Sequence, residues 1–178
     1  IAYRAVELLY EAGVPKEVLH FLPGKGSIVG ATLIEHPDIR GVMFTGSTET
    51  AQLINKTLAA KQGPIVPFIA ETGGQNCMIV DSSALPEQVV RDAISSAFDS
   101  AGQRCSALRV LYVQEDIADT VIEMLIGAMK MLHVGNPAVL SMDIGPVIDT
   151  SSQKTLLAHI KQMNKSAKIL YQCELPKT

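Results

Sequence analysis

The chain has 178 residues, of which 47% are hydrophobic and 19% are charged, and its formal net charge is -3. This balance is typical of a globular protein and excludes a disordered chain, and the absence of a lysine or arginine cluster argues against a nucleic-acid-binding segment. No apolar run approaches the roughly 20 residues of a membrane-spanning helix, and the N-terminus lacks a signal-peptide pattern, so we expect a cytoplasmic protein without a membrane segment.

Short apolar runs alternate along the chain with segments whose apolar residues recur at helical spacing. In chain order the sequence predicts a helix over 1–12, a strand over 18–24, a helix over 27–36, a strand over 40–44, a helix over 47–61, strands over 65–71 and 76–81, a helix over 86–99, a strand over 107–114, a helix over 116–132, a loop over 135–146, a helix over 151–164 and a strand over 168–173. Strands that alternate with helices predict an α/β fold, with a mostly parallel sheet covered by helices.

Two glycine-containing turns lie between a predicted strand and a predicted helix. Gly24, Gly26 and Gly30 form a G-x-G-x-x-x-G pattern, which is one residue longer than the usual dinucleotide-binding spacing. In FTGST, residues 44–48, Gly46 permits close approach of a ligand and Ser47 offers an amide and a hydroxyl to an anion. A plain strand exit followed by a helix cap explains FTGST equally well.

The histidines and cysteines show no metal-binding pattern, but one cysteine stands in a polar, basic setting. Cys105 follows Arg104, and a neighbouring cation favours the reactive thiolate. Cys77 and Cys173 lie in apolar strand patterns and are predicted to be inert. Glu71 ends an apolar strand before a Gly-Gly turn, where partial desolvation would suit a general base. A surface thiol and a helix-cap glutamate are the simpler alternatives for these two residues.

Three motifs occur in the order FTGST, ETGGQN and GQRC, and Cys105 follows Glu71 by 34 positions (105 − 71 = 34). This ordered set resembles the aldehyde dehydrogenase family, whose motifs supply a phosphate contact, a general base and a cysteine nucleophile. The sequence of residues 69–119 is similar to the branch of that family that oxidises glutamate semialdehyde, the open form of pyrroline-5-carboxylate. In bacteria this branch occurs as a module of bifunctional proline-utilisation proteins.

The resemblance implies roles for both reactive residues. Cys105 would attack the aldehyde carbon, with its backbone N–H and an asparagine side chain holding the oxyanion, and hydride would pass to NAD to leave a thioester. Glu71 would activate the water that hydrolyses the thioester. Ser106 resembles a hydroxyl on the substrate side. No metal is implied.

The same resemblance implies the residues that bind NAD. Gly46 and Ser47 match the positions that meet the pyrophosphate, Gly26 lies on the adenosine side, and the backbone of Thr72 meets the nicotinamide amide. Many relatives have a glycine where this chain has Ala51, which would alter helix packing without abolishing the phosphate contact.

The resemblance also implies that the chain is an internal piece of a longer protein. Residues 1–72 would be the second part of a Rossmann-type NAD-binding domain, and residues 73–178 the first part of an α/β catalytic domain. The oxyanion asparagine and the substrate-anchoring loop would lie outside the chain, so we expect the isolated piece to be inactive. The intact protein would be a homo-oligomer that takes a small aldehyde, and any FAD would belong to a separate proline dehydrogenase domain.

The motifs are also compatible with other functions, which the sequence supports to different degrees. An aldehyde dehydrogenase with a different substrate and a non-catalytic structural relative both fit the motifs. A thiol acyltransferase would need a histidine base, and none lies close to Cys105 in sequence. A CoA-acylating or phosphorylating dehydrogenase usually lacks the water-activating carboxylate, so Glu71 argues against that class.

Overall fold

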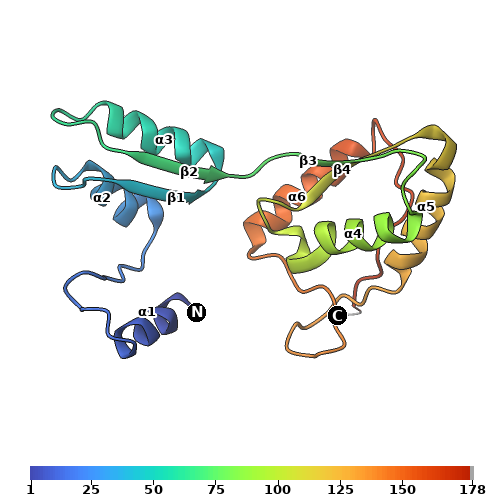
Figure 1. Ribbon diagram of the computed structural model, residues 1–178, viewed down its shortest axis with the longest axis horizontal. Helices are drawn as coiled ribbons and strands as arrows, with labels where there is room; N and C mark the ends of the chain where they lie inside the picture. The colour runs from blue at the N-terminus through green and yellow to red at the C-terminus, as the bar shows by residue number, and fades with distance from the viewer. Residues whose placement is uncertain (177–178) are drawn as a thin grey trace. The chain divides into compact units, whose positions relative to one another are not determined.

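The computed structural model describes residues 1–176, and the chain in it divides into two compact units, Ile1–Thr72 and Gly73–Thr178 (Figure 1). The last two residues of the second unit, 177 and 178, lie outside the described residues. Each unit is built around one pair of parallel strands, so the single sheet that the sequence predicts is present as two separate pairs.

The first unit contains a β-α-β arrangement preceded by helices. Its elements are α1 (Ala2–Glu11), the π-helical turn η1 (Gly26–Gly30), α2 (Ala31–Glu35), β1 (Val42–Gly46), α3 (Thr48–Ala59) and β2 (Phe68–Thr72). The strands β1 and β2 are parallel and α3 connects them, as a parallel pair requires. The helix predicted over 27–36 is present, but it begins as a π-helical turn.

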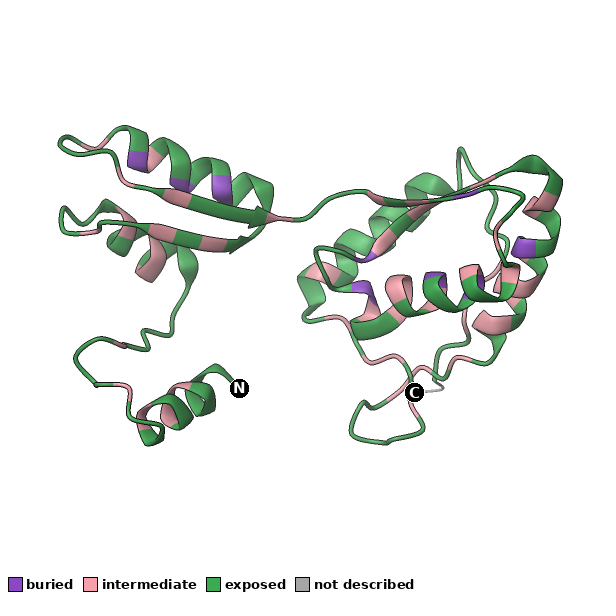
Figure 2. Cartoon of the chain, in the orientation of Figure 1, coloured by how far each residue is buried: buried purple, intermediate pink, exposed green. Residues whose placement is uncertain are grey.

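The helix α3 supplies the core of the first unit. Its buried side chains lie three and four positions apart, on one helical face that packs on the strands and on α2: Ala51, Ile54 and Leu58 (Figure 2). Ala51 is 6% exposed, so its methyl group is part of this core.

The second unit repeats the strand-helix-strand arrangement. Its elements are β3 (Asn76–Val80), α4 (Pro86–Phe98), the 3-10 turn η2 (Asp99–Gly102), β4 (Leu108–Val113), α5 (Glu115–Lys130) and α6 (Thr150–Met163). The strands β3 and β4 are parallel, and α4 packs against β4 and α5. Val121 on α5 is fully buried, and Val80, Val90, Ala93 and Ala107 complete this core.

Local start signals explain where several helices begin. The Ser47 hydroxyl accepts a hydrogen bond from the Thr50 backbone N–H at the start of α3, and the Asp149 carboxylate accepts one from the Ser152 N–H at the start of α6. Pro86 lies at the first position of α4, where its missing N–H costs no helical hydrogen bond.

Two predicted strands are wrong. Residues 18–24 and 168–173 form neither a strand nor a bridge within the described chain. In the first segment the Leu19 carbonyl accepts a hydrogen bond from the Tyr10 hydroxyl, and in the second the Cys173 thiol lies 3.6 Å from the Met129 carbonyl oxygen. Both runs have the apolar composition of a strand, but these contacts join them to residues near the ends of α1 and α5 and not to a neighbouring strand.

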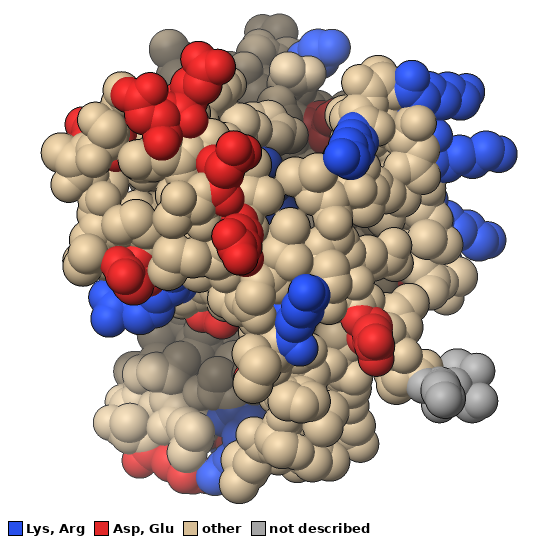
Figure 3. All heavy atoms as spheres, turned by 90° about the vertical axis from the view of Figure 1, so that its right-hand side faces the viewer, with Lys and Arg blue, Asp and Glu red and all other residues tan. Residues whose placement is uncertain are grey.

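Among residues 1–176, no helix combines the length and the apolar character needed to cross a bilayer. On the face drawn in Figure 3, acidic and basic side chains are interspersed with uncharged surface.

Candidate active site

Four of the predicted site residues lie at the carboxyl ends of β1 and β2. The parallel register pairs Thr45 with Glu71 and Gly46 with Thr72, and Ser47 follows β1 directly (Figure 1). The carboxyl ends of parallel strands form one edge, where open α/β folds bind their ligands. The structure therefore brings together Gly46, Ser47, Thr72 and Glu71 within the first unit.

The N-terminus of α3 at this edge is favourable for negative charge. The Ser47 hydroxyl oxygen lies 3.2 Å from the Thr50 backbone nitrogen, which donates to it, and 3.1 Å from the Thr50 hydroxyl, to which it donates. The pKa of Glu49 in the first turn is lowered, first by its own backbone N–H and then by the Ser47 hydroxyl. Backbone N–H groups and the helix dipole together make such an end suitable for a phosphate.

The glycines of the first unit differ in how much space surrounds them. A Cβ at Gly46 would overlap the Phe44 ring, and a Cβ at Gly24 would overlap a methyl group of Val29. By contrast, a Cβ at Gly26 would meet no atom within 4 Å. Gly26 is the first residue of η1 and is exposed.

Glu71 differs from its prediction in burial. We expected a partly desolvated carboxylate, but Glu71 is exposed. Its strand, β2, pairs only with β1 within the described residues.

The second unit carries Cys105 and Ser106 in the segment between η2 and β4, residues 103–107, which we name the Cys105 loop. Both residues are exposed. Ser100, Ala101 and Gly102 have φ values of 56°, 54° and 67°, so three consecutive left-handed residues lead the chain from α4 into this loop. Left-handed non-glycine residues store strain and concentrate at functional segments.

Arg104 makes contacts that the sequence did not predict. Its guanidinium donates to the Ser95 carbonyl oxygen at 3.0 Å and to the Ser96 carbonyl oxygen at 3.4 Å, so it satisfies the carboxyl end of α4. A cation beside the Cys105 thiol, which the sequence suggested, stays a prediction.

Cys77 and Cys173 also have different surroundings from each other. Cys77 is exposed on β3, and its predicted inertness stays a prediction. Cys173 is intermediate in exposure, and desolvation raises the pKa of its thiol. All three cysteines are free.

Sequence reasoning missed Asn76 and Gln103. The Asn76 amide donates to the main chain of the Cys105 loop, and the Gln103 side-chain oxygen accepts from the Ile148 backbone nitrogen at 2.7 Å. A polar first residue in an otherwise apolar strand is the one sequence signal that could have singled out Asn76.

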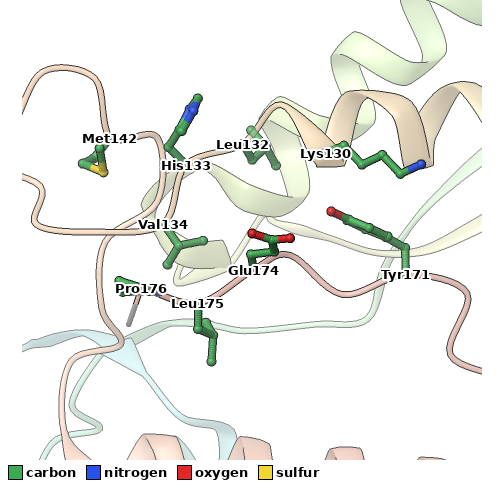
Figure 4. Close-up of a pocket in the computed structure, with 9 residues that line it drawn as sticks. All are labelled: Lys130, Leu132, His133, Val134, Met142, Tyr171, Glu174, Leu175 and Pro176. Atoms are coloured by element: carbon green, nitrogen blue, oxygen red, sulfur yellow. The ribbon is translucent and has the colours of Figure 1, made fainter. Parts of the chain in front are cut away.

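A separate hollow of ≈ 540 Å³ lies in the second unit, away from these motifs in sequence (Figure 4). Lys130, His133, Tyr171 and Glu174 are among the residues that line it. Within the described chain, no three His, Cys, Asp or Glu side chains cluster in a way that could hold a metal ion.

The comparisons with known proteins agree with the motifs. The model of the aldehyde dehydrogenase family matches residues 1–178. The chain is 54% identical over 175 residues to the bifunctional protein PutA of Klebsiella aerogenes, covering 97% of this chain and 13% of that protein. It is 37% identical over 174 residues to a 1-pyrroline-5-carboxylate dehydrogenase of Anoxybacillus flavithermus, covering 96% of this chain and 34% of that enzyme.

Solved structures give the same result. A crystal structure of proline utilization A (PutA) from Bradyrhizobium japonicum has a TM-score of 0.96 and 55% identity, covering 100% of this chain and 18% of that one. A Thermus 1-pyrroline-5-carboxylate dehydrogenase with bound NAD has a TM-score of 0.91 and 31% identity, and the match covers 98% of this chain and 34% of that one. The chain thus spans only a fraction of the length of each of these relatives. Both of its units contain helices and parallel strands, which is an α/β fold. It belongs to the aldehyde dehydrogenase family.

Proposed function

We propose that the protein containing this chain oxidises L-glutamate γ-semialdehyde, the open form of pyrroline-5-carboxylate, to glutamate in proline catabolism, with NAD as the hydride acceptor. One observation carries the proposal: the register of β1 and β2 aligns the FTGS and ETGG motifs at one edge, beside the N-terminus of α3. The relatives named PutA and 1-pyrroline-5-carboxylate dehydrogenase support the substrate, and the NAD-bound Thermus relative supports the cofactor.

The described residues fit a dinucleotide. The capped end of α3 and the adjacent Gly46 would receive the pyrophosphate through Ser47, Thr72 would meet the nicotinamide amide, and Gly26 would lie on the adenosine side. When bound, NAD supplies an acceptor for the hydride of the substrate.

The protein residues carry the remaining chemistry. The Cys105 thiolate forms a bond to the aldehyde carbon, and the resulting oxyanion accepts a hydrogen bond from the Cys105 backbone N–H. Loss of hydride converts this adduct into a thioester. Glu71 takes a proton from water, whose oxygen attacks the thioester carbon and releases the carboxylic acid and the thiolate. Ser106 would contact the substrate.

The two units correspond, in this proposal, to the second part of an NAD-binding domain and the first part of a catalytic domain. We further propose that the intact protein is a cytoplasmic homo-oligomer and that the isolated chain lacks activity, since it spans 13% of the PutA relative.

The experiment is NADH formation by the full-length protein with pyrroline-5-carboxylate. We expect Cys105→Ala to abolish the rate and Cys77→Ala, at an exposed cysteine of the same unit, to retain it. Glu71→Gln should release a burst of about one NADH per site and then turn over slowly, because the thioester forms but is not hydrolysed. If the wild type forms no NADH, the proposed substrate or the proposed dehydrogenase activity is wrong. If Cys105→Ala stays active, Cys105 is not the nucleophile.

A further inference from the structure

The Cys105 loop is tied to β3 by one side chain. The Asn76 Nδ2 atom donates to the Cys105 carbonyl oxygen at 2.7 Å and to the Ala107 carbonyl oxygen at 2.9 Å. These two carbonyls lie on either side of Ser106. The Asn76 amide group therefore holds the main chain on both sides of Ser106, the residue after Cys105.

The chemistry of the partners determines which way the Asn76 amide points. Both partners are carbonyl oxygens, which only accept hydrogen bonds, so the NH₂ group must face them and both of its hydrogens are used. The Asn76 Oδ1 atom faces the other way, 3.5 Å from the point that a Cβ on Gly74 would occupy. The side chain thus lies between the Gly-Gly turn and the Cys105 loop.

The position of Asn76 in the strand is also unusual. Asn76 is aligned with Leu108 and the next residue, Cys77, with Val110, so the register of β3 and β4 shifts at this point. Such an irregularity locally disrupts the ladder and re-aims side chains, and it often lies next to an active site. Here the Asn76 side chain supplies hydrogen bonds where the regular ladder begins.

We propose that Asn76 is a positioning residue for the reaction of Cys105. It fixes the peptide plane on the carboxyl side of Cys105, and thereby the orientation of the Cα atom that carries both the thiol and the oxyanion-binding N–H. This inference rests on the proposed function. In this proposal Asn76 acts through the Cys105 loop and not through a contact of its own with substrate or cofactor.

Other contacts keep the frame of the loop in place without Asn76. The Ser96 hydroxyl accepts from the Leu108 backbone nitrogen at 3.1 Å, and the Arg109 guanidinium donates to the Gly102 carbonyl oxygen at 2.6 Å. Loss of the Asn76 contacts should therefore disturb residues 103–107 locally and leave the rest of the unit folded.

The test compares Asn76→Asp and Asn76→Ala in the full-length protein. The aspartate has the same shape, but it removes both donors and places a carboxylate oxygen against two carbonyls, whereas alanine only removes the donors. Misplacement of a reacting group by about 1 Å can cost about 100-fold in rate. We expect kcat for NADH formation to fall about 10- to 100-fold, more for aspartate than for alanine, with the KM values for NAD and substrate within about two-fold of wild type.

Hydrogen exchange supplies a readout that does not depend on catalysis. Peptides covering 103–108 should exchange faster in both variants, while peptides from α5 exchange as in wild type. Asn55→Asp, at an exposed position of α3, is the matched control for the added charge and should change neither kcat nor exchange.

The outcomes separate the two hypotheses. An unchanged kcat in both Asn76 variants overturns the proposal, and so does faster exchange throughout the second unit, because Asn76 would then support the fold as a whole. If wild type forms no NADH, the proposed function fails, and the exchange comparison alone decides whether Asn76 anchors the loop.

Discussion

Gly102→Ala tests the turn that leads into the Cys105 loop. Gly102 has φ +67°, where a residue with a Cβ atom costs about 1–2 kcal/mol. That Cβ would also lie 2.7 Å from the Ala97 carbonyl oxygen and 3.2 Å from an Arg109 guanidinium nitrogen. Backbone is the closer neighbour, and forcing extra atoms into such a packed position costs about 1–3 kcal/mol. We therefore expect the variant to lose roughly 2–5 kcal/mol of unfolding free energy.

Gly127→Ala is the matched control. Gly127 lies inside α5, and a Cβ there would meet no atom within 4 Å, so alanine should stabilise the helix by about 0.5–1 kcal/mol. The same chemical change is thus expected to have opposite signs at the two positions. Urea unfolding of the purified protein, followed by circular dichroism, measures both. A Gly102→Ala variant within about 0.5 kcal/mol of wild type would refute the reasoning.

Three further predictions concern caps and the core. Ser47→Ala removes the acceptor for the Thr50 N–H, so it should cost about 1 kcal/mol of unfolding free energy and raise the KM for NAD. Val121→Ala opens a cavity at a side chain with 0% exposure and should cost about 1–3 kcal/mol in a urea titration. The hydrogen bond from the Ser152 backbone N–H lowers the pKa of the Asp149 carboxyl in the folded protein. The carboxylate therefore stabilises the fold fully at a pH above its pKa in the unfolded chain, about 3.9. This stabilisation is lost as the pH falls through the lower pKa of the folded protein. Asp149→Asn keeps the cap and should flatten the dependence of the unfolding midpoint on pH below about 5.

Each of these predictions has a control or a contradicting outcome. Ser47→Thr keeps a hydroxyl and should retain most of the stability and the KM. Ile79→Ala, at a side chain that is 80% exposed, should change stability by less than about 0.5 kcal/mol, and a loss equal to that of Val121→Ala would contradict the burial argument. An acid profile of Asp149→Asn identical to that of wild type would contradict the assigned cause of the pKa shift.

The helices α3, α4 and α5 could be predicted because local signals agree along each of them. An apolar face at helical spacing coincides with a cap or a proline at the start of α3 and α4, and acidic residues open α5. Strands need a partner as well as a composition. The run at 168–173 has four apolar residues in six and β4 has five in six, so their compositions are close. No strand of the described chain lies beside 168–173, so composition alone predicted a strand that does not form.

Residue types and their order single out the candidate site residues in the sequence, whereas contacts between residues distant in sequence leave no such signal. A polar, basic setting singled out Cys105, and a strand exit singled out Ser47. The Asn76 contacts join positions 29 and 31 residues apart, and their acceptors are backbone carbonyls, which every residue has. No sequence pattern reports such an acceptor.

The contacts of the GQRC motif bear on the choice between an enzyme and a non-catalytic relative. Gly102 is needed for a turn, Gln103 bonds to residues 146 and 148, and Arg104 caps α4, so folding alone would account for these three. Among the described residues, neither the Cys105 thiol nor the Glu71 carboxylate makes a hydrogen bond, and both residues are exposed. Substitutions at Gly102, Gln103 or Arg104 are therefore expected to disturb folding as well as any activity. Cys105→Ala and Glu71→Gln remove no hydrogen bond of the described chain, so these two variants test catalysis separately from folding.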